Sequence, residues 1–226
     1  MWTRKELKLR AKDGLNRNYW KAVLISAIFT LVFSGGSILT HKSDKLDDII
    51  GYAFINNPFL VIFTGLFGFI AFALFIILIV FLINPFKVGV CKFRINALNG
   101  SANIADTALG YDVSYKRNVN TLFFMNLFIG LWSLLFIVPG IVKYYEYSMI
   151  PYILSEDPNI SRQEAFIKSK KLMSGNKWRA FVLTLSFIPW YILGALTFGV
   201  VSLFYVQPYQ QLTSAALYEE LKKTCL

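Results

Sequence analysis

The sequence contains little charge for its length. Charged residues make up 16% of the 226 residues, against about 25% in typical soluble domains. Hydrophobic residues make up 56%, and the mean hydropathy is +0.52. A soluble fold of this size could not bury so much apolar surface. The composition therefore argues against a cytosolic enzyme, a secreted disulfide scaffold and a disordered tail, and it indicates an integral membrane protein.

Residues that commonly carry chemistry are also scarce. His41 is the only histidine, which excludes any site that needs two. Cys91 and Cys225 both fall in segments that we place on the cytoplasmic side, so we expect them reduced and unpaired. The acidic cluster at 44–48 lacks the spacing of a calcium loop, and no P-loop or nucleophile motif is present. We expect no metal, no cofactor and no enzymatic activity.

Long uncharged stretches define the architecture. A membrane helix needs about 20 mostly apolar residues. The uncharged stretch 180–218 is 39 residues long, which would make a helix of about 58 Å, nearly twice the thickness of the membrane core. It must be a hairpin, broken around 194–199. We predict an all-α polytopic membrane protein, a single domain with a six-helix transmembrane bundle. The predicted spans are 22–39, 59–83, 118–138, 141–155, 179–194 and 199–218.

The fourth span is short and contains two charged residues, so its assignment depends on the loops around it. If it crosses the membrane, both termini are cytoplasmic, and so are 20 of the 23 Lys and Arg residues. These include the basic residues of the segments 84–117 and 156–179. If it does not cross, the segment 156–179 with its six basic residues lies outside, against the positive-inside rule. We therefore predict six crossings with both termini inside.

Three segments between the spans have amphipathic helical patterns: 3–16, 46–54 and 161–174. The first and third begin with capping boxes, at Thr3–Glu6 and Ser161–Glu164, and Gly175 ends the third. We expect these short helices to lie flat on the membrane. The net charge of +10 then belongs to the inner face and not to a nucleic-acid site. The predicted contacts with lipid or a partner are Arg4, Lys5, Lys8, Lys12, Lys168 and Lys171.

Polar residues within the predicted spans are candidates for binding. Lys143 and Glu146 are spaced to pair on one helix face. Ionisable groups within a membrane span are energetically costly, so their presence there indicates a function or a structural pairing. They are either part of a polar site or ion path, or a structural pair near the membrane surface. Gln207 and Gln211 lie in the most polar stretch of the last span, and we expect them to face the bundle.

The second half of the chain carries a specific pattern of residues. It includes Pro139-Gly140-Ile141, Tyr147-Ser148-Met149, Glu164-Ala165, Met173-Ser174-Gly175, Lys177-Trp178 and Leu185-Ser186-Phe187. This pattern resembles a bacterial integral membrane family catalogued as domain of unknown function 975. Pro189-Trp190 stands where that family often has Gly-Trp. More distantly, the sequence is similar to the membrane module of some glycerophosphodiester phosphodiesterases. The resemblance implies a bacterial plasma membrane protein and supplies no established function.

Two functions fit these observations. The first is a non-enzymatic membrane protein that acts through membrane lipids, a membrane protein or amphipathic peptide partner, or a second copy of itself. Its role would lie in envelope homeostasis or in defence against membrane-active peptides. The alternative is a small transporter or channel with a polar path near Lys143 and Glu146. Charge removal on the inner helices should weaken association in the first case, and substitution of Lys143 or Glu146 should abolish flux in the second.

Overall fold

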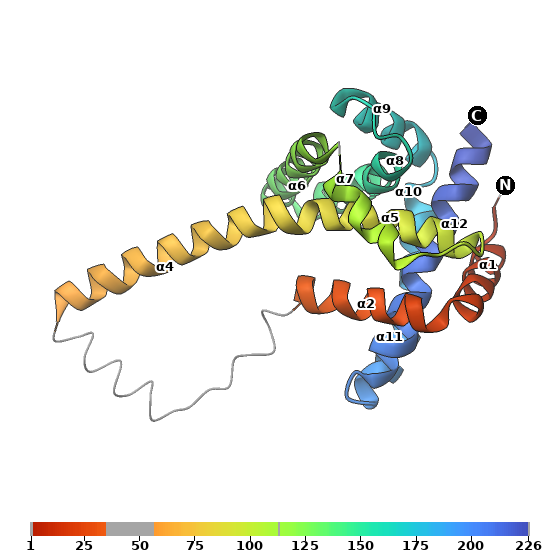
Figure 1. Ribbon diagram of the computed structural model, residues 1–226, viewed down its shortest axis with the longest axis horizontal. Helices are drawn as coiled ribbons and strands as arrows, with labels where there is room; N and C mark the ends of the chain where they lie inside the picture. The colour runs from red at the N-terminus through yellow and green to blue at the C-terminus, as the bar shows by residue number, and fades with distance from the viewer. Residues whose placement is uncertain (1, 35–56, 113, 226) are drawn as a thin grey trace.

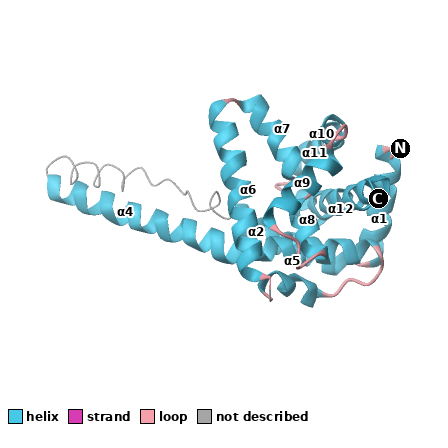
Figure 2. Ribbon diagram, turned by 90° about the horizontal axis from the view of Figure 1, so that it is seen from above, coloured by secondary structure: helices cyan, strands magenta, loops and turns pink. Residues whose placement is uncertain are grey.

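The computed structural model describes residues 2–34, 57–112 and 114–225, and over these ranges it contains helices and no strand (Figure 2). The predicted all-α class is confirmed there. The first half contains α1 (Arg4–Arg17), α2 (Tyr19–Ser34), α4 (Pro58–Leu78), the π-helical η2 (Ile79–Ile83), α5 (Asn84–Leu98) and the 3-10 helix η3 (Ile104–Tyr111). The second half contains α6 (Tyr115–Leu135), α7 (Ile137–Tyr147), α8 (Ile150–Glu156), α9 (Arg162–Met173), α10 (Lys177–Leu185), α11 (Ile188–Leu196), the π-helical η4 (Ser202–Val206) and α12 (Gln207–Cys225).

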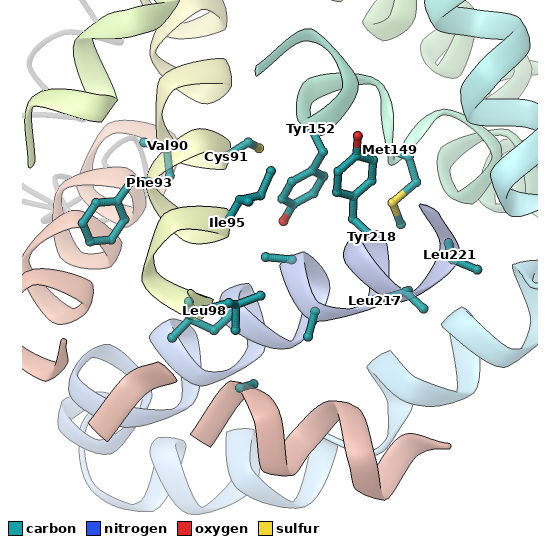
Figure 3. Packing of buried hydrophobic residues seen from close by; sticks show 14 of the residues in the cluster. Val90, Cys91, Phe93, Ile95, Leu98, Met149, Tyr152, Leu217, Tyr218 and Leu221 are labelled. Carbon is teal, nitrogen blue, oxygen red and sulfur yellow. The ribbon is translucent and has the colours of Figure 1, made fainter. Parts of the chain in front are cut away.

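Helix α5 is the centre of the fold, because other helices cover it on several sides. It packs against η3, α12, α8, α1 and α6 (Figure 1). Val90 and Phe93 are almost completely buried, and each such side chain contributes about 1.5–3 kcal/mol relative to an exposed one. Figure 3 shows Cys91 and Ile95 of the same helix on the side of Tyr152 of α8 and Tyr218 of α12. The two tyrosine rings stack with their centroids 5.2 Å apart, which joins α8 to α12 next to α5.

The contact between α5 and η3 requires glycine on both sides. A Cβ atom on Gly89 of α5 would lie 2.0 Å from the carbonyl oxygen of Thr107. A Cβ atom on Gly110 of η3 would lie 1.8 Å from the carbonyl oxygen of Pro85. Both neighbours are backbone atoms, which cannot move aside as the end of a side chain can. The missing side chains therefore allow η3 to lie directly on α5.

One apolar helix extends from α5 away from the body of the protein. The helical run Phe59–Leu98 is 40 residues long, or about 60 Å at 1.5 Å per residue. Its outer part is exposed, with Phe59 at 77% and Phe69 at 70%, and Figure 1 shows α4 projecting from the other helices. The run is continuous through the π-helical η2, where Tyr115 donates a hydrogen bond to the carbonyl oxygen of Phe81 at 2.8 Å and Tyr111 donates one to that of Leu82.

Among the described residues, three helical runs are long and apolar enough to cross a membrane: Phe59–Leu98, Tyr115–Leu135 and Lys177–Leu196. The α4 part of the first run places large aromatic side chains on its exposed surface. Such a surface is compatible with a membrane protein, because lipid can cover apolar side chains that water would not.

The structure divides several predicted spans. The span 141–155 is interrupted between α7, which ends at Tyr147, and α8, which begins at Ile150 with Pro151 in its first turn. Proline is favoured there and disrupts a continuous helix. The predicted break at 194–199 is confirmed, since Phe198 and Gly199 have positive φ angles of 51° and 86°. The remainder of the span 22–39 beyond Ser34, His41, the acidic cluster at 44–48 and the predicted helix 46–54 lie outside the described residues.

Both inner amphipathic helices are present, but protein covers their apolar faces. Thr3 and Ser161 form the predicted capping boxes of α1 and α9. The backbone and hydroxyl hydrogen bonds of Ser161 hold the pKa of Glu164 below its usual range. Leu7 and Leu15 of α1 are buried, in a helix that packs on α12 and α5. We expected these faces to rest on lipid; the structure instead places them inside the protein, so only the opposite faces can meet a membrane surface.

The glycine contact between α5 and η3 leads to a stability prediction. Gly89→Ala should lower the free energy of unfolding by about 1–3 kcal/mol, because the added methyl group must push η3 off α5. Gly65→Ala is the matched control, because nothing lies within 4 Å of its added Cβ atom, and alanine favours a helix over glycine. Thermal unfolding in detergent should show a lower midpoint for the first variant alone. Equal midpoints would mean that η3 does not lie as closely on α5 as the structure shows.

Candidate functional site

Lys143 and Glu146 form a closed ion cluster with a third residue. The Lys143 ammonium lies 2.9 Å from Glu146 Oε1, and the Lys177 ammonium lies 2.5 Å from Glu146 Oε2. The Glu146 side chain is only 4% exposed. Ser169 also donates a hydrogen bond to the Glu146 backbone carbonyl at 2.7 Å. These contacts connect α7 with α9 and α10.

This arrangement favours the structural interpretation of the pair. A buried carboxylate is costly unless charged groups compensate it, and here each carboxylate oxygen has its own ammonium partner. Lys143 also lies over the rings of Trp132 and Tyr147, at 5.6 and 5.5 Å from their centroids. The i, i+3 pair is predictable from sequence spacing, but Lys177 is not, because it lies 31 residues beyond Glu146 in the chain.

Gln207 and Gln211 connect α12 to α2. Gln207 Oε1 accepts a hydrogen bond from Thr30, and Gln211 Oε1 accepts one from Ser26 at 2.9 Å. Gln211 Oε1 also accepts a hydrogen bond from Arg94 Nη2 of α5 at 3.0 Å. Of these two glutamines, Gln211 lines a large cavity in the body of the protein.

The cavity has a volume of about 620 Å³ and lies among α5, α6, α7, α8, α10 and α12. Helix α5 contributes Lys87, Cys91 and Arg94, which are spaced i, i+4 and i+7 and therefore share one face. Hydroxyl groups of tyrosine, serine and threonine make up much of the polar wall, including Tyr144, Tyr152 and Ser148. Apolar wall residues are Met125, Ile129, Met149, Leu183, Phe187 and Leu217.

Arg94 is one of the residues that line the cavity, and one of its donors has no partner. Its residue is 8% exposed, and its Nε atom is buried without a hydrogen-bond partner. Nη2 donates to Gln211, and the guanidinium lies 4.9 Å from the centroid of the Phe29 ring. A buried donor without an acceptor costs about 1–3 kcal/mol, and more in a charged group. A ligand atom that accepts from Nε would remove this cost.

Lys87 adds a second positive charge without a carboxylate nearby. Within the described part of the chain Lys87 forms no ion pair, and no Asp or Glu lines the cavity. Two basic side chains and a set of hydroxyl groups are hydrogen-bond donors that suit an anion. Within the described ranges, no three His, Cys, Asp or Glu side chains gather as metal ligands do.

The other predicted contact residues divide into two sets. Arg4, Lys5, Lys8 and Lys12 line one groove along α1, of about 560 Å³. Lys168 and Lys171 lie on α9 and do not line this groove. The groove shares no lining residue with the cavity.

The sequence interpretation missed Lys87 and Arg94, because it predicted no helix within the segment 84–117. The apolar run continues instead through the helical α5, and most of that helix is buried. The spacing of Lys87, Cys91 and Arg94 on one helical face was the available signal. It could have been found only if the helix had been extended past Pro85, which the structure places in the first turn of α5.

Comparison with protein families matches residues 70–225 to the family described as Protein of unknown function (DUF975). No curated protein and no solved structure matches the chain. The match covers α5 and the whole second half, which contain almost every residue that lines the cavity. The more distant likeness to the membrane module of glycerophosphodiester phosphodiesterases stays a prediction.

The Glu146 cluster leads to a second prediction. Glu146→Gln should destabilise the protein towards the lower end of the roughly 3–5 kcal/mol seen when one partner of a buried pair is removed, because both lysines stay partly exposed. Lys143→Gln should cost less, since Lys177 still pairs with the carboxylate. Unfolding midpoints in detergent measure both effects. A Glu146→Gln protein as stable as the parent would reopen the possibility of a functional path at this position.

Proposed function

The chain belongs to the family of unknown function DUF975, and we propose that it is a non-enzymatic membrane protein that binds an anionic amphiphile. The anionic headgroup would lie at Lys87 and Arg94, and its apolar chain would lie along the apolar wall of the cavity. One observation carries this proposal: the buried Arg94 has an unpaired Nε donor beside a cavity that no carboxylate lines.

The size and chemistry of the cavity support this ligand class. Its volume of about 620 Å³ falls in the range of roughly 300–1,000 Å³ that is usual for ligand sites. Guanidinium groups suit phosphate and carboxylate oxygens, because their donors match the acceptor geometry. The tyrosine and serine hydroxyl groups can donate to further oxygens of the same headgroup. The positive charge disfavours a cationic peptide in this site and favours an anionic lipid or lipid-like acid.

We propose binding rather than catalysis because of the residues that line the cavity. No described lining residue is a histidine, aspartate or glutamate, the groups that most often act as general acids and bases. The cavity is also preferred to the pair Lys143–Glu146 as the functional centre, because both oxygens of that carboxylate already have ammonium partners. Binding of a membrane amphiphile would fit a role in envelope homeostasis or peptide defence.

We further propose six crossings of a bacterial plasma membrane, with both termini cytoplasmic. Three helical runs meet the length and apolarity of a span in one piece. The other crossings would be α2, α7 with α8, and η4 with α12. This arrangement is proposed because it places most of the basic residues on the inner side.

The cavity proposal can be tested with dodecyl phosphate, a single-chain anionic amphiphile, in a Cys225→Ser background. Cys91 is then the only thiol, and it lines the cavity. Native mass spectrometry should measure its binding, and occupancy of the cavity should slow alkylation of Cys91. Arg94→Gln should weaken this binding about 10- to 100-fold, because a charge-assisted hydrogen bond is worth roughly 1.5–3 kcal/mol.

Two comparisons make this experiment decisive. Arg162→Gln is the matched control, since Arg162 is an exposed arginine over Phe124 and does not line the cavity. Dodecyl maltoside provides the same chain without charge. Equal protection of Cys91 by the neutral detergent, or unchanged affinity of Arg94→Gln, would refute the anionic site.

The six-crossing arrangement predicts where reporter fusions are active. Alkaline phosphatase, which is active only outside the cytoplasm, should be active when fused after Lys45 and inactive when fused after Lys170 or Leu226. Green fluorescent protein should show the opposite pattern. An active phosphatase after Lys170 would mean that α7 and α8 together do not cross the membrane.

A further inference from the structure

Helix α1 separates its cations into paired and unpaired sets. Arg10 pairs with Glu219 at 3.5 Å, and Arg17 pairs with Asp13. The carboxylate of Glu6 accepts from the backbone N–H of Thr3 in the capping box. Four other cations have no carboxylate partner within the described ranges: Arg4, Lys5, Lys8 and Lys12.

The four unpaired cations all line the groove of about 560 Å³, with Thr3, Leu9, Ser186 and Tyr209. None of these lining residues is acidic. The groove runs along the edge of α1, between its cations and the residues Ser186, at the end of α10, and Tyr209 of α12. Leu9 is 57% exposed among the cations. Cations around an exposed aliphatic side chain are typical of a helix surface that meets lipid headgroups.

Lys8 is held in position at the inner wall of the groove. Its ammonium donates to the Ser186 carbonyl oxygen at 3.3 Å and lies 4.4 Å from the centroid of the Phe187 ring. Burial and the neighbouring Arg4 guanidinium lower the pKa of Lys8. Both effects disfavour the charged ammonium, and an anion in the groove would compensate them.

The groove is distinct from the cavity of the proposed function. Phe187 lines the cavity and Tyr209 lines the groove, and their rings meet edge to face with centroids 5.3 Å apart. This aromatic pair stands between two positively charged spaces. Lys5 and Lys12 can therefore be substituted without changing a printed contact of the cavity wall, whereas Lys8 also contacts Phe187.

We propose that the α1 groove binds the phosphate headgroup of an anionic phospholipid from the membrane around the protein. The density of unpaired positive charge identifies the headgroup, and exposed Leu9 provides contact for the apolar part of the same lipid. A membrane lipid is favoured over an acidic protein partner because a groove of about 560 Å³ accommodates a headgroup rather than a helix. This inference does not depend on a ligand in the cavity.

The test is lipid binding to the full chain in maltoside detergent, followed by native mass spectrometry. Dioleoylphosphatidylglycerol should bind more tightly than zwitterionic dioleoylphosphatidylcholine, and added salt should weaken its binding. The triple variant Lys5→Gln, Lys8→Gln, Lys12→Gln should bind it about 100-fold more weakly at low salt, since each basic residue near an anionic surface contributes a comparable attraction. The single variants Lys5→Gln and Lys12→Gln remove side chains without a protein partner, so their smaller losses do not depend on folding.

The matched control is Lys168→Gln, Lys170→Gln, Lys171→Gln on α9, which removes the same charge from a helix outside the groove. It should keep phosphatidylglycerol binding near that of the parent. An equal loss in this control would mean that net charge, and not the groove, attracts the lipid, and would overturn the proposal. Displacement of the lipid by millimolar inorganic phosphate would also overturn it, because the site would then take the free anion. Arg94→Gln separates the two sites, since it should leave groove binding unchanged.

Discussion

The close packing of η3 on α5 is the constraint on which the rest of the structure depends. Gly89 and Gly110 let two backbones approach to a distance that no side chain would permit. With η3 in place, α5 is covered on several sides, and α1, α8 and α12 can gather around it. The face of α5 that carries Lys87, Cys91 and Arg94 is then directed into the protein. One continuous helical run therefore forms the exposed apolar helix α4 at its start and one wall of the cavity at its end.

Charge compensation divides the polar residues of this protein into two groups. Glu146 is fully compensated by Lys143 and Lys177, and Glu156 by Lys222 at 2.7 Å together with a hydrogen bond from Tyr218. The cations of the cavity and of the α1 groove have no such partners among the described residues. Folding alone does not favour leaving a buried cation such as Arg94 without a carboxylate partner. The cavity is therefore a candidate ligand site because its arginine is buried, the α1 groove is one because its exposed cations are close together, and the compensated groups have structural roles.

The sequence predicted local features well and distant contacts poorly. The capping boxes at Thr3 and Ser161 were predictable, because each depends on two residues three positions apart. The turn at Phe198–Gly199 was predictable from the local glycines. Lys177 beside Glu146 and Gln211 beside Arg94 were not, because the partners lie 31 and 117 residues apart in the chain. The cavity was missed because the predicted span ended at residue 83, whereas the helical run continues through Pro85 in the first turn of α5.

The π-helical η2 joins the exposed helix α4 to the buried α5. At this junction the rotation of α4 about its own axis can change while α5 stays in place. A π-helical turn holds one residue more than an α-helical turn, and each residue rotates a helix by about 100°. Loss or gain of one residue within Ile79–Ile83 would therefore turn α4 around its axis and leave α5 fixed on η3. Tyr111 and Tyr115 donate hydrogen bonds to backbone carbonyl groups at this junction. Backbone carbonyl groups are present with or without the extra residue, so the same tyrosines can bind the helix in both cases. The lipid-facing surface of α4 can thus diverge between related proteins without any change in the cavity.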